Sequence, residues 1–359
     1  MTDSLIILDA HQDIAWNALD LDRDFTESAY VKRKREQGTP TQQKEGISML
    51  GLPEALLGRV AIIFSTIWAC PANSIMLASP RHSYTTPAEA HKIGMMQADY
   101  YHRLADTHPQ IALIRDQREL DGVLETWRDG MALDQRKVGL VLLMEGADPI
   151  REPRAFEEYY ERGVRIVGLA WEGTRYSGGT NAPGGLTTLG RELLEVLSSY
   201  KVILDVSHSA EKAFYESLDV YDGPIIASHS NPRRFRDSDR HLSDTMIRRL
   251  VERGGVMGIV PFNKFLWEPE DRPERKKDAP ISRVVDAIDY VCQIAGSADH
   301  VGLGTDFDGG FGAEKTPDQL DTLADLRGLI PLLQGRGYSL SDIERICSGN
   351  FLRVLREAL

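Results

Sequence analysis

Short, apolar, β-branched runs recur along the chain, each followed by a loop with Gly, Pro or Asn and then by a stretch of helical periodicity. The runs expected to form the main strands are 5–10, 60–69, 138–145, 164–171, 201–208, 223–229, 254–262 and 300–309. The helical stretches are 87–106, 117–130, 153–162, 188–199, 209–218, 242–253 and 280–296. Continuous apolar strands that alternate with helices are typical of parallel sheets, and eight repeats favour an α/β fold of the (β/α)8 TIM-barrel type.

The chain departs from a minimal barrel between its first two main strands. Residues 17–59 are charged and poorly periodic, and we interpret them as an insertion that serves as a lid or a subunit contact. The run at 111–116 does not fit the eightfold count and is expected to be a short extra strand or part of an excursion after the second main strand. We expect one (β/α)8 barrel domain over residues 1–359.

The C-terminal segment, 317–359, follows the last main strand. It is expected to be helical at 317–334 and at 341–357. Ser341 and Glu344 have the spacing of a capping box, which predicts that the second helix begins there.

The composition argues against nucleic acid and membranes as partners. A formal net charge of -12 and a sequence pI near 5.3 give an average field that repels both nucleic acid and anionic lipid. The basic run KRKRE at 32–36 is therefore interpreted as a solvated helix face rather than a nucleic-acid patch. We find no signal-peptide pattern and no apolar stretch long enough to span a membrane. Because Cys70, Cys292 and Cys347 are far apart and odd in number, we expect reduced thiols and a cytoplasmic location.

Side chains that can bind metal ions occur where the predicted strands end. They are His11, Asp13, Glu145, His208, His229 and Asp306. The carboxyl ends of barrel strands meet at one mouth, where the active sites of such barrels lie. Each residue alone has an ordinary structural explanation, but buried carboxylates are costly unless they are paired or bind a metal. The coincidence therefore predicts one metal site.

The other histidines do not end a predicted strand. We expect these residues to be solvent-facing or structural, and they are His82, His91, His102, His108, His241 and His300. The contrast supports a functional interpretation of the strand-end histidines.

The ligand types narrow the choice of metal. Imidazole with carboxylate suits Zn, Mn, Fe or Co better than Ca, and the absence of cysteine argues against a closed structural zinc site. The set holds more ligands than one ion needs, which predicts two Zn²⁺ ions per chain, with Mn, Fe or Co as alternatives. Glu145 is the only Glu in the set, so it is expected to bridge the two ions together with a hydroxide.

Several short motifs, in order along the chain, resemble those of a known family. They are DAHQD, MEG, LDVSH, ASHSN, DRHLSD, GLGTDFDG and GNFLRVLRE. Together they are similar to the membrane (renal) dipeptidase family, a branch of the amidohydrolase superfamily of metal-dependent (β/α)8 barrels. The resemblance runs from residue 5 to residue 357 and so covers nearly the whole chain.

The resemblance implies a role for each matching residue. The metal ligands it implies are His11 and Asp13 for the more buried ion, His208 and His229 for the second, and Glu145 for both. Asp306 would take a proton from the bridging hydroxide and pass it to the leaving amine. Arg240 falls where the family places the arginine that binds the terminal carboxylate of the dipeptide, and a guanidinium fork suits that task. Competing arginines lie at 233, 234 and 236.

The sequence departs from the mammalian pattern at the end of the fourth strand. Where those members carry a histidine near the reacting carbonyl, this sequence has Trp171. An indole donates through one N–H and cannot act as an acid or base. We therefore expect Trp171 or Tyr176 to contact substrate as a hydrogen-bond donor. There are two alternatives: the second metal stabilises the reacting carbonyl oxygen, or Trp171 only forms a wall of the pocket.

The expected function is hydrolysis of the peptide bond of dipeptides, both L-Xaa-L-Xaa and L-Xaa-D-Xaa, by a metal-bridged hydroxide. One alternative is another amidohydrolase reaction, such as deacylation of N-acyl-amino acids or opening of lactones. A second is a non-catalytic metal-binding barrel. The expected partner is a small dipeptide, and the resemblance favours a homodimer.

Overall fold

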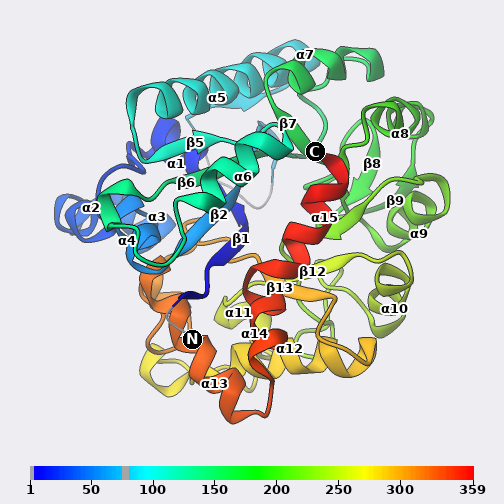
Figure 1. The fold of residues 1–359 in the computed structure, drawn as a ribbon. Helices are drawn as coiled ribbons and strands as arrows, with labels where there is room; N and C mark the ends of the chain where they lie inside the picture. Colours follow the sequence, from blue (N-terminus) through cyan, green and yellow to red (C-terminus); the bar gives the residue numbers. More distant parts are fainter. Residues whose placement is uncertain (1–3, 75–80) are drawn as a thin grey trace.

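The computed structural model describes residues 4–74 and 81–359 (Figure 1). Parallel strands close into a ring in which β1 pairs with β2 on one side and β13 on the other, and β2 pairs with β6. In ring order the strands are β1 (Ile7–Gln12), β2 (Val60–Trp68), β6 (Val138–Glu145), β7 (Val164–Gly168), β10 (Ile203–Asp205), β11 (Ile225–Ala227), β12 (Val256–Ile259) and β13 (Val301–Leu303). The expected (β/α)8 barrel is confirmed.

Each predicted main run contains one strand, but most of the strands end earlier than predicted. β10, β11 and β13 stop before His208, His229 and Asp306, so these residues lie in the loops that follow. The run at 111–116 contains β5 (Ile111–Leu113), which pairs with the first part of β6 outside the closed ring. This confirms the expectation of a short extra strand.

Helices surround the barrel in the positions that the periodicity predicted (Figure 1). They are α5 (Pro87–Thr107), α6 (Gln117–Glu125), α7 (Phe156–Glu161), α8 (Thr188–Tyr200), α9 (Glu211–Val220), α10 (Asp244–Glu252) and α12 (Ser282–Ala295). The apolar sides of the helices pack on strands that are buried along their whole length, such as β2 and β6. None of the described helices combines the length and apolar composition that crossing a membrane requires.

The C-terminal segment closes one end of the barrel. α13 (Leu329–Gly335), α14 (Leu340–Glu344) and α15 (Asn350–Ala358) follow β13, and α15 contacts strands on both sides of the ring (Figure 1). The predicted capping box is wrong: Ser339 caps α14 with Asp342, instead of Ser341 with Glu344. The sequence GYSLSDIE offers both pairs at the same spacing, and the helix begins at the first.

The insertion at 17–59 contains short helices that are tied to the barrel. They are the end of α1 (Ile14–Leu21), then α2 (Ala29–Glu36), α3 (Pro40–Glu45) and α4 (Leu52–Leu57). The carboxylate of Asp308, which follows β13, accepts hydrogen bonds from Ser48 Oγ and from the backbone N–H groups of Met49 and Leu50. The Asp308 side chain thus fixes the insertion to the mouth of the barrel.

The prediction that KRKRE forms a solvated helix face is only partly right. Lys34 and Arg35 are exposed, but Lys32 is buried and donates to the backbone carbonyls of Asp24 and Glu27. Glu36 is also buried, in an ion pair with Arg23. A buried charge persists only where it has such partners, so α2 uses its charges to hold the insertion together.

Candidate active site

A cavity of about 370 Å³ opens at the carboxyl ends of the barrel strands. Its floor includes Asp13, Glu145, His208, His229 and Asp306. Its sides come from the loops that follow β1, β2, β7, β11, β12 and β13. This is the end at which a (β/α)8 barrel collects side chains from many strands.

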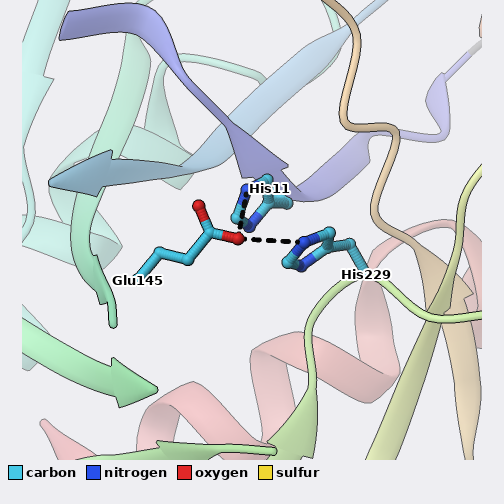
Figure 2. A group of neighbouring side chains, drawn as sticks. All are labelled: His11, Glu145 and His229. Carbon is cyan, nitrogen blue, oxygen red and sulfur yellow. Dashed lines mark ion pairs between the residues drawn. The ribbon is translucent and has the colours of Figure 1, made fainter. Parts of the chain in front are cut away.

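Three imidazoles converge on one carboxylate oxygen in the floor. Glu145 Oε1 lies 3.2 Å from His229 Nε2 and 3.7 Å from His11 Nε2, and Figure 2 shows these side chains pointing toward one another. His208 Nε2 lies 3.2 Å from the same oxygen and 3.1 Å from His229 Nε2. The rings of His11 and His229 are stacked, with centroids 3.5 Å apart.

Two further carboxylates approach the same nitrogen of His11 as Glu145 does. Asp13 Oδ1 and Asp306 Oδ1 are each 3.9 Å from His11 Nε2. The hydroxyl of Thr66 donates to Asp13 Oδ1 and fixes its position. The structure thus brings together all the strand-end residues named from the sequence, and we call them the acid–histidine cluster: His11, Asp13, Glu145, His208, His229 and Asp306.

The cluster contains two groups suited to hold a metal ion, and His11 belongs to both. One is His11 with Glu145 and His229, and the other is His11 with Asp13 and Asp306. Within each group the ligand atoms lie within 4.8 Å of one another. Imidazole and carboxylate ligands in a shared site suit a pair of borderline divalent ions.

The electrostatics of the cluster also fit a bound cation. Burial, followed by the charges of Asp13 and Asp306, raises the pKa of Glu145 well above its ordinary value. Burial raises the pKa of Asp13 to about 6, and burial with the nearby Asp13 charge raises the pKa of Asp306 well above normal. A divalent cation would relieve this crowding of carboxylates.

The histidines are ready to bind a metal as neutral ligands. Burial lowers the pKa of His11, His208 and His229 well below the ordinary value. His11 Nε2 is buried and has no hydrogen-bond partner among the described residues. An orphaned buried nitrogen is costly, and a metal ion at this position would satisfy it.

A second layer of hydrogen bonds orients the imidazoles. Ser228 Oγ is 2.8 Å from His229 Nδ1 and donates to Asp205 Oδ2 at 2.6 Å. Thr180 Oγ1 is 2.9 Å from His208 Nδ1. Such outer contacts fix which ring nitrogen faces a metal.

A second buried aspartate supports the start of the cluster. Asp9 accepts hydrogen bonds from the backbone N–H and hydroxyl of Thr305 and from Gln12 Nε2, and so links β1 to the loop that carries Asp306. Our sequence reasoning missed Asp9 and Asp205. The available signal was an acidic residue inside an apolar strand, in ILDAH and ILDVSH.

Backbone strain occurs at two cluster residues. His208 has φ 63° and Asp306 has φ 55°, in the left-handed region that non-glycine residues seldom adopt. Such conformations persist where the surrounding structure enforces them, and they gather at functional sites. The tight turns also explain why β10 and β13 end before these residues.

Arg240 lies beside the cluster and lines the cavity. Its guanidinium donates to the carbonyl of His229 at 2.7 Å and to Ser230 Oγ at 3.3 Å, so the side chain is held in place and nearly fully buried. Of the competing arginines, Arg236 also lines the cavity but pairs with Glu268, and Arg233 pairs with Glu211.

Trp171 and Tyr176 have different positions. Trp171 lines the cavity and packs edge-on against Trp68, with centroids 4.8 Å apart. Tyr176 is fully buried, lies outside the cavity and donates its hydroxyl to the carbonyl of Ile150. The structure therefore corrects the expectation for Tyr176, because its only donor is already used inside the protein.

The sequence reasoning missed most of the aromatic side chains around the cavity. On one side Trp16, Trp68 and Trp171 form what we call the tryptophan wall. On the other side Phe262, Phe265 and Phe311 form the phenylalanine wall, in which Phe262 stacks on Phe311 at 4.2 Å. The indole N–H groups of Trp16 and Trp68 are buried without partners among the described residues.

Comparison with known proteins connects this cavity to a family. Residues 1–359 match the family described as membrane dipeptidase (peptidase family M19). A relative from Klebsiella pneumoniae, the uncharacterized protein in the pqqA 5′ region, is 35% identical over 233 residues, which is 62% of this chain and 83% of that protein. Dipeptidase tcpJ of Claviceps purpurea is 29% identical over 280 residues, which is 72% of this chain and 61% of that protein. The chain therefore matches less than two thirds of the length of this named dipeptidase.

Solved structures share the whole fold. The dipeptidase AC, a metallo peptidase, has a TM-score of 0.79 at 23% identity, with 99% of each chain covered. A metallo peptidase from Rhodobacter sphaeroides, liganded with a phosphinate mimic of the dipeptide L-Ala-D-Ala, has a TM-score of 0.79 at 22% identity, again with 99% of each chain covered. At these identities the likeness establishes the architecture.

Proposed function

The chain belongs to the membrane dipeptidase family (peptidase family M19), a family of metallopeptidases, and from this membership we propose how its cavity hydrolyses the peptide bond of a dipeptide. The observation that carries the proposal is the position of Glu145. Its Oε1 atom lies 3.2 to 3.7 Å from the Nε2 atoms of His11, His208 and His229. A carboxylate so placed can share its charge between two metal ions.

The metal cofactor that the family implies fits the residues present. We propose two Zn²⁺ ions, with Mn, Fe or Co as alternatives. His11 and Asp13 would hold the first, His208 and His229 the second, and Glu145 both, because these residues supply neutral imidazoles and carboxylates in one buried site. When bound, the ions would polarise the scissile carbonyl group and activate the attacking water.

Asp306 is proposed as the proton carrier. Its carboxylate lies at the cavity surface and near His11, and the burial that raises its pKa lets it accept a proton. Asp306 would take a proton from the attacking water and pass it to the departing amino nitrogen. Protons then balance, because water supplies OH to the new carboxyl group and H to the amine.

Arg240 is proposed to bind the terminal carboxylate of the dipeptide. Two of its N–H groups are used within the protein, and a guanidinium has five. The remaining donors suit a carboxylate in the cavity, which Arg240 lines. Trp171 would pack against the other end of the substrate, where its indole offers an apolar face and one donor.

A panel of substrates tests the proposal. The metal-loaded protein should cleave L-Xaa-L-Xaa and L-Xaa-D-Xaa dipeptides, and the phosphinate complex of the Rhodobacter sphaeroides structure gives reason to include L-Ala-D-Ala. N-acyl-amino acids and lactones belong in the same panel, since the same cluster could activate water against them. Cleavage of these compounds without cleavage of any dipeptide would reject the proposal.

We further propose a cytoplasmic homodimer. The three cysteines, Cys70, Cys292 and Cys347, are free and buried, which suits a reducing compartment. Leu57 and Leu133 are exposed and line one apolar surface groove, which suits a subunit contact. Light scattering measures the oligomeric state of the wild-type protein and of a Leu57→Glu variant. A monomeric wild-type protein would reject the proposed homodimer.

A further inference from the structure

Positive charge lies at the phenylalanine wall. The guanidinium carbon of Arg240 is 5.7 Å from the centroid of the Phe265 ring, and Lys264 directly precedes Phe265 in the chain. Both cations line the cavity. Since Arg240 is on this side, the C-terminal residue of a bound dipeptide would face the phenylalanine wall.

His241 is an unexplained buried side chain on this side. It is 1% exposed and lines the cavity, next to Arg240 in the sequence. Neither its Nδ1 nor its Nε2 atom has a hydrogen-bond partner in the described part of the chain. A buried polar group without a partner lowers stability, so the ring is suited to a ligand rather than to the fold. Of the two expectations for His241, solvent-facing or structural, its burial excludes the first.

The surrounding structure holds the imidazole in position. The backbone N–H of His241 donates to the carbonyl of Ser238 at 3.2 Å, and its carbonyl accepts from Arg233 Nη2 at 3.2 Å. The ring meets the edge of Phe265, with centroids 4.6 Å apart. Burial, followed by the charge of Arg240, lowers the pKa of His241 well below its ordinary value. A neutral ring offers one N–H donor to the cavity.

Lys264 supplies a positive charge that the protein does not use. It is exposed at the cavity edge and takes part in no ion pair within residues 4–74 and 81–359. By contrast, Arg236 is paired with Glu268 at 3.1 Å. A dipeptide with an uncharged C-terminal side chain would engage Arg240 through its terminal carboxylate and would leave both His241 and Lys264 without a partner.

We propose that His241 and Lys264 form a subsite for a second carboxylate, so that the preferred substrates are dipeptides whose C-terminal residue is aspartate or glutamate. The inference rests on the proposed dipeptidase function, since it assigns the side chain of the residue whose terminal carboxylate Arg240 binds. His241 donates one hydrogen bond to the side-chain carboxylate, and Lys264 adds its charge at the cavity edge. His241 thus determines specificity and takes no part in the chemistry.

Matched substrates test the subsite. L-Ala-L-Glu and L-Ala-L-Gln have nearly the same shape and differ in one charge, and the same pair with a D residue second covers both configurations. We expect kcat/KM to be at least about tenfold higher for the glutamate member of one pair, since a hydrogen bond to a charged group contributes about this much. Equal or lower values for glutamate in both pairs would overturn the proposal.

Variants assign the preference to the two residues. His241→Phe keeps the ring size but removes the donor, and it should lower the glutamate-to-glutamine ratio about tenfold with little change for L-Ala-L-Gln. His241→Asn retains an N–H donor and should keep part of the preference. Lys264→Met should lower the ratio a few-fold, with a smaller effect at high salt. Lys92→Met, which removes an exposed charge from α5, should not change it.

A binding measurement separates this inference from the proposed function. Calorimetry with the metal-depleted protein measures the affinity for L-Ala-L-Glu and L-Ala-L-Gln without hydrolysis. The subsite is supported if the glutamate dipeptide binds more tightly than the glutamine dipeptide and if His241→Phe and Lys264→Met each weaken this tighter binding. This result would hold even if no dipeptide were cleaved. Equal affinities for the two dipeptides, or equal losses for both in each variant, would reject it whatever the activity.

Discussion

The acid–histidine cluster and the two aromatic walls are built in different ways. Each cluster residue ends a barrel strand or follows one closely, and a second layer that includes Asp9, Asp205 and Ser228 fixes its position. Apart from Trp68, which ends β2, the walls come from loops and short helices such as α11 (Asn263–Leu266), and several of their polar atoms have no partner among the described residues.

This difference separates the reaction from the choice of substrate. A cluster held by strands and inner hydrogen bonds cannot adjust without loss of its geometry. A wall formed by loops can change its side chains while the strands stay in place. We therefore expect changes in the cluster to abolish activity, changes in the second layer to weaken metal binding, and changes in the walls to alter the ranking of substrates.

The largest effect is expected for Glu145→Gln. The amide lacks the negative charge that three imidazoles approach, so the protein should lose bound metal and all measurable hydrolysis. Elemental analysis and a dipeptide assay measure the two losses. The exposed Glu152→Gln serves as the matched control and should retain both metal and activity. Full metal content in Glu145→Gln would show that this residue is not a ligand.

Asp306→Asn should separate metal binding from proton transfer. Asparagine keeps the shape but cannot carry a proton, so kcat should fall roughly a hundredfold to ten-thousandfold while metal content stays near normal. The exposed Asp237→Asn should behave as wild type. Loss of metal together with activity would instead make Asp306 a ligand, which its place near His11 and Asp13 also permits.

A smaller effect is expected for Asp205→Asn in the second layer. Asp205 accepts hydrogen bonds from the backbone N–H groups of Ser207 and Ser228 and from the Ser228 hydroxyl, which contacts His229. Its replacement should weaken metal affinity roughly tenfold to a hundredfold, and excess zinc should restore activity. Competition with a chelator measures the affinity. Activity that stays low at saturating zinc would mean that Asp205 acts on the chemistry directly.

The smallest effect is expected for Trp171→Phe. Phenylalanine keeps an aromatic face but removes the indole N–H, so kcat/KM should fall by about twofold to tenfold, as for one neutral hydrogen bond. Metal content should not change. A fall in kcat as large as that of Asp306→Asn would place Trp171 in the reaction itself rather than in the wall.

The sequence predicted the cluster better than the walls for a physical reason. In a closed barrel every strand ends at the same mouth, so the order of strands alone brings His11, Glu145 and His229 together. No comparable rule directs a loop residue. His241 could not be assigned to the cavity, because its position depends on how separate loops pack. Trp68 ends β2 beside Glu145, so the strand-end rule could have placed it at the mouth.

Local signals also failed where two of them competed. Ser339 and Ser341 each begin a capping-box pattern, and spacing alone does not choose between them. The ends of β10 and β13 were overestimated because the apolar runs continue into loops, where His208 and Asp306 adopt left-handed backbone conformations. The buried part of α2 depends on a long-range ion pair, and no periodicity of its own reveals this.

The most direct test of the account is to titrate metal-depleted protein with Zn²⁺ and to follow hydrolysis of one dipeptide. We expect no activity without metal and a rise that ends near two equivalents per chain, the number that the cluster can hold with Glu145 shared. Full activity without metal, or no hydrolysis at any zinc concentration, would contradict the assignment of this cavity as a metal-dependent dipeptidase site.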